Sequence, residues 1–207
     1  WQPGQDIMHS CGPGRIKKVD SFLVVSHQDD PYMIEIYCLR SIDDGQTWFD
    51  TTCVSQYDSV SGQLSAMDTD DSGGVHIVWY DYKYSPYAWT GDIFYRTSSN
   101  SGNTWQPIDI LTTEHRAAAS DILAERHNLH VVWEDDRNDE DFEIYYLLST
   151  DLGQTWEQEV RLTDAVGWSR RPSLACGNNY LRLFWFDTRD NQPANSGEIY
   201  YKRKDLL

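Results

Sequence analysis

The sequence has no long apolar run, little positive charge and few cysteines, and each shortage excludes a class of protein. No stretch of the 207 residues approaches the ~20 consecutive apolar residues that a membrane-spanning helix needs. The net charge of −16 leaves no basic surface for nucleic acid or an anionic membrane, so neither is an expected partner. No window of about 15 residues keeps a helical apolar period, so we expect essentially no helix.

The four cysteines, Cys11, Cys38, Cys53 and Cys176, lack the paired spacing of a zinc site. Cys38 and Cys53 stand almost symmetrically about a turn, so the sequence leaves open a disulfide across one hairpin or two free thiols. A disulfide would imply an oxidising compartment. We expect a secreted protein, extracellular or periplasmic.

The sequence is rich in aromatic residues and contains internal repeats. Aromatic residues make up 14% of the chain, enough with the other apolar residues to build a substantial core. One turn pattern occurs three times, at 41–48, 98–105 and 149–156, each time between two extended runs. In each copy we expect an Asp or Asn to accept backbone bonds, a Gly to adopt positive φ and a Trp to pack beneath the turn. These structural residues are Asp43, Gly45, Trp48, Asn100, Gly102, Trp105, Asp151, Gly153 and Trp156.

Two further patterns repeat with the turn. A Trp-centred apolar strand recurs at 75–81, 129–135 and 181–187, and a second strand precedes each turn. The period of ~50 residues is typical of propeller blades. We therefore predict an all-β propeller, one domain over residues 1–207, with four four-stranded antiparallel blades in units of about 1–47, 48–104, 105–155 and 156–207.

The chain ends bear on ring closure. Residues 1–3 repeat the Trp-Gln-Pro of residues 105–107, which opens a fourth strand. The N-terminal strand is therefore predicted to complete the last blade, because pairing of the two ends would remove exposed sheet edges. Alternatively, the four blades belong to a larger propeller or an oligomer.

The turn pattern Ser-x-Asp-x-Gly-x-Thr-Trp resembles the Asp-box, the bacterial neuraminidase repeat. With the preceding strands it is similar to the repeats of sialidase-like β-propellers over nearly the whole chain. The resemblance implies that the boxes lie away from the active face, so Asp43, Asn100 and Asp151 are not catalytic candidates. Because Asp-boxes occur in glycosidases, lectin-like proteins and sorting receptors, the resemblance implies no single function.

The loops at the other end of each blade hold the candidate site, since loops on a rigid scaffold usually carry function. Guanidinium groups bind carboxylates bidentately, and aromatic faces suit sugar rings, so a carbohydrate or a small acidic ligand is expected. The repeated Asp–Arg pairs have a competing interpretation, in which they only link neighbouring blades. The candidate ligand-binding residues are Arg116, Arg137, Arg171, Arg189, Trp168, Trp89, His115, Asp135 and Asp187.

Catalytic residues stay unassigned. Sialidase chemistry in the resembling family needs three arginines, an acid/base Asp and a Tyr–Glu pair, and this set has no residue-by-residue match here. A binding module is therefore the leading hypothesis, with an exo-sialidase-like glycoside hydrolase and a non-catalytic interaction scaffold as alternatives. No cofactor is expected. Calcium is a minor alternative, because carboxylates gather at 135–141 and 68–71 without the EF-hand spacing.

Overall fold

The computed structural model describes residues 15–19, 22–29, 35–58, 60, 62–87, 89–138, 141–190 and 197–206. Over these ranges the chain is all-β, as predicted, and it contains no helix that could cross a membrane. The strands are β1 (Arg15–Val19), β2 (Phe22–Asp29), β3 (Glu35–Ser41), β4 (Phe49–Cys53), β5 (Gly62–Thr69), β6 (Val75–Asp81), β7 (Asp92–Ser98), β8 (Asp109–Ile110), β9 (Ala117–Glu125), β10 (Asn128–Asp135), β11 (Glu143–Ser149), β12 (Val160–Arg161), β13 (Ser169–Gly177), β14 (Tyr180–Asp187) and β15 (Glu198–Asp205).

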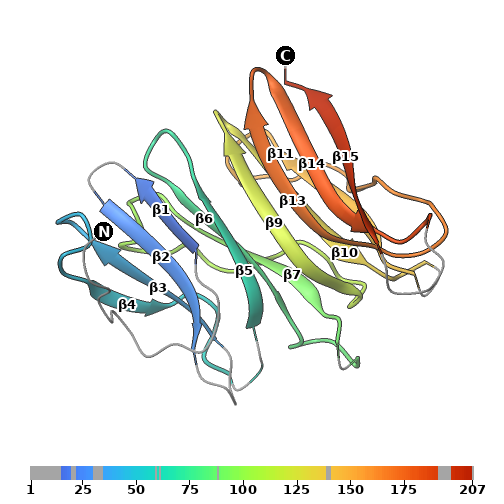
Figure 1. The fold of residues 1–207 in the computed structure, drawn as a ribbon. Coiled ribbons are helices and arrows are strands. Elements are labelled where there is room, and N and C mark those ends of the chain that lie inside the picture. The colour runs from blue at the N-terminus through green and yellow to red at the C-terminus, as the bar shows by residue number, and fades with distance from the viewer. Residues whose placement is uncertain are drawn as a thin grey trace.

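The strands form four antiparallel sheets in chain order, and these sheets stand side by side (Figure 1). Sheet 1 contains β1–β4, sheet 2 contains β5–β8, sheet 3 contains β9–β12, and sheet 4 contains β13–β15. The prediction of four-stranded antiparallel blades is confirmed for sheets 1 to 3. The N-terminal strand that was predicted to complete sheet 4 falls on residues 1–14, outside the described residues.

Apolar faces between neighbouring sheets form the core. The middle of β6, β10 and β14 carries Trp79, Trp133 and Trp185, each almost fully buried. Trp79 packs against Ile36 and Cys38 of sheet 1, and the Trp of each later sheet likewise packs against the sheet before it. The first strands contact one another in the order β1, β5, β9, β13, so they form the inner line of the stack.

The repeated turns, residues 41–48, 98–105 and 149–156, are tied by their own side chains. In the third copy the Ser149 hydroxyl donates to Asp151 Oδ1 (2.8 Å), and the Gly153 amide donates to Ser149 Oγ (2.8 Å). Asp151 also accepts bonds from the hydroxyl and the amide of Thr155, and these bonds hold its pKa at about 2. Gly153 has φ +84°, a conformation that favours glycine.

The repeated turns and the loops that follow β10 and β14 lie at opposite ends of the sheets. In sheet 3, Ser149 pairs with Leu129 at one end, whereas Glu143 pairs with Asp135 at the other. The turn at residues 149–156 and the loop after Asp135 are therefore separated by the full length of the strands.

The cysteines that could have formed a disulfide are free thiols. Across β3 and β4, Tyr37 stands opposite Cys53 and Cys38 stands opposite Thr52. Because successive side chains of a strand point to opposite faces, Cys38 and Cys53 project from opposite sides of the sheet. The symmetric spacing about the turn therefore did not bring the thiols together. Cys11 lies outside the described residues.

Candidate functional site

A central hollow of about 540 Å³ opens where the inner strands of sheets 2, 3 and 4 begin. Ala117 at the start of β9 pairs with Asp135, and Ser169 at the start of β13 pairs with Asp187. The hollow therefore lies at the end of the sheets that is opposite the repeated turns. Its chemically distinctive lining residues are Arg15, Gln63, Tyr80, Trp89, Glu134, Arg170 and Arg171.

A β-bulge interrupts three of the inner strands, β5, β9 and β13, beside the hollow. The register shifts between Gln63 and Ala66 in β5 and between Arg170 and Ser173 in β13. In β9 the shift lies opposite Val132 and Glu134, which belong to the paired strand β10. In β13 the bulge places Arg171 at φ +54°, a conformation that few non-glycine residues adopt. Bulges of this kind redirect a side chain next to functional sites. Here the redirected side chain is the Arg171 guanidinium.

Glu134 holds this bulge from the neighbouring sheet. Its carboxylate is buried and accepts bonds from Arg170 Nε (3.1 Å) and Nη2 (2.7 Å) and from the Arg171 amide (2.7 Å). The Arg170 guanidinium also stacks on Phe142, at 4.2 Å from the ring centre. Glu134 therefore neutralises Arg170 and fixes the backbone of Arg171. Within the described part of the chain, the guanidinium of Arg171 has no hydrogen-bond or ion-pair partner.

Sheet 2 supplies the aromatic side of the hollow. The Tyr80 hydroxyl donates to Gln63 Oε1 (3.0 Å) and accepts a bond from the Tyr82 hydroxyl (3.4 Å). Burial, together with the Tyr82 bond, raises the pKa of Tyr80 far above its usual range, so this phenol stays neutral. Trp89 is 82% exposed and leaves a large ring free to stack on a ligand.

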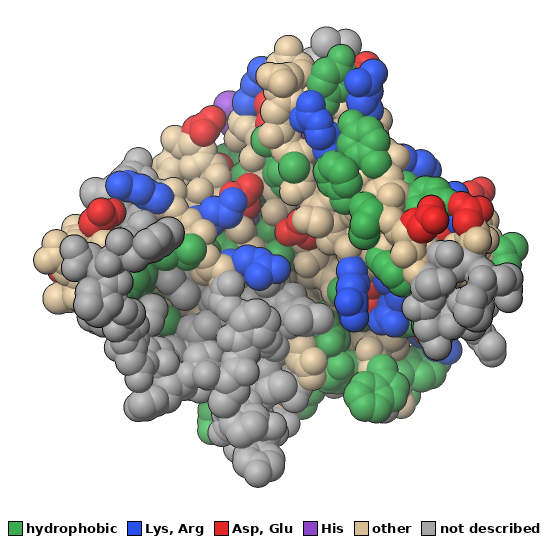
Figure 2. All heavy atoms as spheres, in the orientation of Figure 1, with side chains coloured by type: hydrophobic (Ala, Val, Ile, Leu, Met, Phe, Trp, Pro, Cys, Tyr) green, Lys and Arg blue, Asp and Glu red, His purple; other side chains and the backbone are tan. Residues whose placement is uncertain are grey.

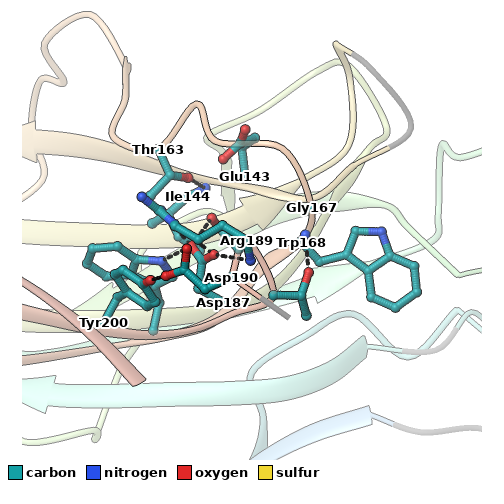
Figure 3. A network of polar contacts seen from close by, with 12 residues as sticks. Glu143, Ile144, Thr163, Gly167, Trp168, Asp187, Arg189, Asp190 and Tyr200 are labelled. Atoms are coloured by element: carbon teal, nitrogen blue, oxygen red, sulfur yellow. Dashed lines mark hydrogen bonds and ion pairs between the residues drawn. The ribbon is translucent and has the colours of Figure 1, made fainter. Parts of the chain in front are cut away.

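The predicted residues Asp187 and Arg189 form a closed corner at the end of β14 (Figure 3). Arg189 donates to both Asp187 oxygens (2.9 and 2.7 Å), and Trp185 Nε1 donates to the same carboxylate (2.7 Å). Burial alone would raise the pKa of Asp187, but these hydrogen bonds hold it below its usual range. The Arg189 guanidinium also covers the Tyr200 ring at 4.4 Å.

The same corner occurs in sheet 3. Arg137 donates to Asp135 through Nε (2.9 Å) and Nη2 (2.6 Å), and it also pairs with Glu159. Trp133 donates to Asp135 from behind (3.2 Å). Both Asp–Arg pairs therefore close within one loop, not between neighbouring blades. Their guanidinium groups are engaged, and none of the four residues lines the central hollow.

Three other predicted residues lie in nearby loops and do not line the hollow. His115 donates from Nδ1 to Asp92 (2.6 Å), and Arg116 stacks on Tyr87 at 3.8 Å from the ring centre. The indole of Trp168 is 42% exposed and points away from the Asp187–Arg189 corner (Figure 3).

Of the nine predicted ligand-binding residues, Arg171 and Trp89 line the hollow. The space-filling view shows Lys and Arg side chains near the middle of the molecule, with hydrophobic side chains beside them (Figure 2). Arg15, Arg170 and Glu134 were not among the predicted site residues. A signal for Glu134 was present, because the matching positions in the other Trp-centred strands are aromatic, Tyr80 and Phe186.

The described residues contain no group of three or more His, Cys, Asp or Glu side chains placed to hold a metal ion. Asp139 and Glu140 of the predicted calcium loop fall outside those residues. In the second acidic stretch, Asp70 accepts bonds from Ser72, Gly74 and His76, so it caps its own turn.

Comparison by sequence finds no matching protein-family model and no matching curated protein. Solved structures are similar in fold. An α-L-arabinanase of Penicillium chrysogenum complexed with arabinobiose superposes with a TM-score of 0.68 at 15% identity, over 93% of this chain and 62% of that structure. The NanB sialidase of Streptococcus pneumoniae gives 0.65 at 13%, over 99% and 52%. A mutant Trypanosoma rangeli sialidase that displays trans-sialidase activity gives 0.68 at 15%, over 94% and 36%.

The chain thus spans less than two thirds of the length of each of these three structures. At such low identity the likeness bears on architecture, which matches the four stacked antiparallel sheets. The chain has the fold of a sialidase-like β-propeller.

Proposed function

We propose that this chain is a carbohydrate-binding propeller whose central hollow takes a sugar with an acidic group. The observation that carries the proposal is the Arg171 guanidinium, which pairs with none of the described residues and is presented by a bulge whose backbone Glu134 binds. A positive φ at a non-glycine residue costs free energy and persists where the surroundings enforce it. The Glu134 carboxylate accepts the Arg171 amide and so holds this backbone beside the hollow.

The lining residues suit the parts of such a ligand. The planar guanidinium of Arg171 can bind a carboxylate through two parallel hydrogen bonds, and Arg15 adds positive charge to the same hollow. The exposed face of Trp89 can stack on a sugar ring, and Gln63 can exchange hydrogen bonds with hydroxyls. The similar structures include an α-L-arabinanase complexed with arabinobiose and sialidases, and the cationic lining of the hollow favours an acidic sugar.

Calorimetric titration with N-acetylneuraminic acid, glucuronic acid and arabinobiose tests the proposal. We expect an acidic sugar to bind the wild type and to bind Arg171→Ala at least tenfold more weakly. Arg126→Ala is the matched control, because Arg126 is an exposed arginine in the turn between β9 and β10, at the other end of the sheet. If no acidic sugar binds, or if both variants bind like the wild type, the proposal fails.

A glycoside hydrolase is the second candidate, because the hollow holds a carboxylate and a phenol and the similar structures include glycoside hydrolases. Both Glu134 oxygens, however, are bonded to Arg170 and Arg171, which suits a positioning role better than proton transfer. Fluorogenic sialosides and arabinosides assayed from about pH 4 to 8 decide between binding and turnover. A scaffold without a small ligand would show neither.

A further inference from the structure

Two arginines of the central hollow differ from the other arginines that the structure describes. Six of those others pair with carboxylates, namely Arg116, Arg126, Arg137, Arg161, Arg170 and Arg189. Four more bond to backbone carbonyls or stack on a ring, namely Arg40, Arg96, Arg182 and Arg203. The guanidinium groups of Arg15 and Arg171 have no ion pair, hydrogen bond or ring contact with the described residues, and both residues line the hollow. In a chain of net charge −16, two unpaired guanidinium groups therefore meet at one place.

The carboxylates near these two groups are bonded elsewhere. Glu134, the acidic residue of the lining, pairs with Arg170. Asp121 attracts Arg15 electrostatically, but its Oδ2 accepts the Leu174 amide of the next sheet at 2.8 Å. The lining contains three arginines and one glutamate, so its net charge is +2. A ligand with two negative charges would neutralise it.

Arg15 and Arg171 reach the hollow from different sheets. Arg15 opens β1 of sheet 1 and Arg171 lies in β13 of sheet 4, and β5 and β9 stand between these strands in the inner line (Figure 1). The two strands between them add neutral residues to the lining, Gln63 from β5 and Ala119 from β9. Ala119 holds the same place in its bulge as Arg171 in β13, but it carries only a methyl group. The hollow thus has a positive charge on each side of a neutral middle.

Given the proposed sugar-binding function, on which this step rests, we infer that the hollow takes two consecutive uronic-acid sugars, with one carboxylate on Arg171 and the other on Arg15. A guanidinium group binds a carboxylate through two parallel hydrogen bonds. One uronic acid carries one carboxylate, so two guanidinium groups on separate strands suit two joined units. A doubly charged single group, such as a sugar phosphate, would leave one guanidinium unpaired.

The size and the aromatic side of the hollow suit such a disaccharide. Its volume of about 540 Å³ lies within the range of about 300–1,000 Å³ that is usual for pockets enclosing a small ligand. The exposed ring of Trp89 can stack on one of the two sugars. The Gln63 side chain lies in the neutral middle, where the hydroxyls of the joined sugars would be.

Calorimetric titration of the whole chain with galacturonic acid, mannuronic acid and the disaccharide of each tests this ligand. We expect at least one disaccharide to bind the wild type at least tenfold more tightly than its monosaccharide, because a second carboxylate gains a second guanidinium. The dimethyl ester of that disaccharide removes both negative charges and keeps both sugar rings. It should bind at least tenfold more weakly than the free acid.

Substitutions then assign the two carboxylates. Arg15→Ala should abolish the preference for the disaccharide and leave the affinity for the monosaccharide unchanged, because Arg171 is still present. Arg171→Ala should weaken the binding of both. Arg15→Lys keeps the charge without the planar fork and should restore part of the preference. Lys18→Ala is the matched control, because Lys18 is an exposed cation of the same strand that does not line the hollow. An unchanged urea midpoint shows that each variant is folded.

Two results overturn the disaccharide ligand and leave the proposed function standing. The first is equal affinity of the wild type for monosaccharide and disaccharide, with binding still sensitive to Arg171→Ala. The second is a preference for the disaccharide that Arg15→Ala does not change. Tighter binding of galacturonic acid phosphate than of either disaccharide also overturns it, because two charges on one group would then suffice. If no sugar acid binds at all, the proposed function fails together with this ligand.

Discussion

Removing the charge of Glu134 should loosen the joint between sheets 3 and 4. Glu134→Gln keeps the side-chain volume but leaves one acceptor oxygen for three donors from Arg170 and Arg171. An unpaired buried donor costs about 1–3 kcal/mol, and bonds to charged groups contribute about 1.5–3 kcal/mol. Because the Arg170 side chain is 33% exposed, water offsets part of this loss. We expect the free energy of unfolding to fall by about 2–3 kcal/mol.

Urea unfolding followed by tryptophan fluorescence measures this change, and a double-mutant cycle assigns it to the pair. Arg170→Met removes the guanidinium while keeping an unbranched side chain. If Glu134 and Arg170 act together, Glu134→Gln combined with Arg170→Met should cost less than the sum of the single changes, by about 1 kcal/mol or more. A loss below about 0.5 kcal/mol for Glu134→Gln, or additive single changes, would refute the assigned role.

Three further predictions address the turns, the thiols and pH. Gly153→Ala should cost about 2–4 kcal/mol, because it adds a Cβ at positive φ against the Tyr95 ring. Gly177→Ala should be nearly neutral in the same urea assay, because its Cβ would meet only Arg182 Nη1, at an ordinary contact distance of 3.7 Å. Ellman's reagent should label the exposed Cys176 in the folded protein but reach Cys38 only on unfolding. Cys38 is protected because it is buried and because burial raises its pKa to about 12. Fast labelling of Cys38 in the folded protein would contradict its burial. Although burial opposes it, hydrogen bonds lower the Asp70 pKa from 3.8 to about 2, so the stability it adds is present above about pH 4 and is lost as pH falls toward 2. Asp70→Asn should therefore reduce the loss of unfolding free energy between about pH 4 and pH 2 by about 1–2 kcal/mol. An unchanged pH dependence would contradict the hydrogen bonds assigned to the Asp70 carboxylate.

The fold could be predicted because its signals are local and repeat. The extended runs, the turn glycines and the spacing of Trp48, Trp105 and Trp156 each obey short-range rules, and three copies reinforce one another. The central hollow could be predicted only in part, because its key contact joins residues 37 positions apart on different sheets. The positive φ of Arg171 arises at a bulge that recurs in β9, where Ala119 has φ +34°, and the carboxylate that binds the Arg171 amide lies on another sheet.

The repeated Asp–Arg pairs, which had a competing structural interpretation, bind each other and do not line the central hollow. An arginine two residues after a strand-end Asp reaches that same carboxylate, as Arg137 and Arg189 do. Its positive charge is therefore already paired and is not available to a ligand. A guanidinium remains available where the repeat departs from its pattern and no neighbouring carboxylate faces it. Arg171 meets that condition, because Glu134 takes Arg170 and the Arg171 amide and leaves the Arg171 side chain unpaired within the described structure. In a propeller built from copies, recognition should therefore be sought where one copy differs from the others.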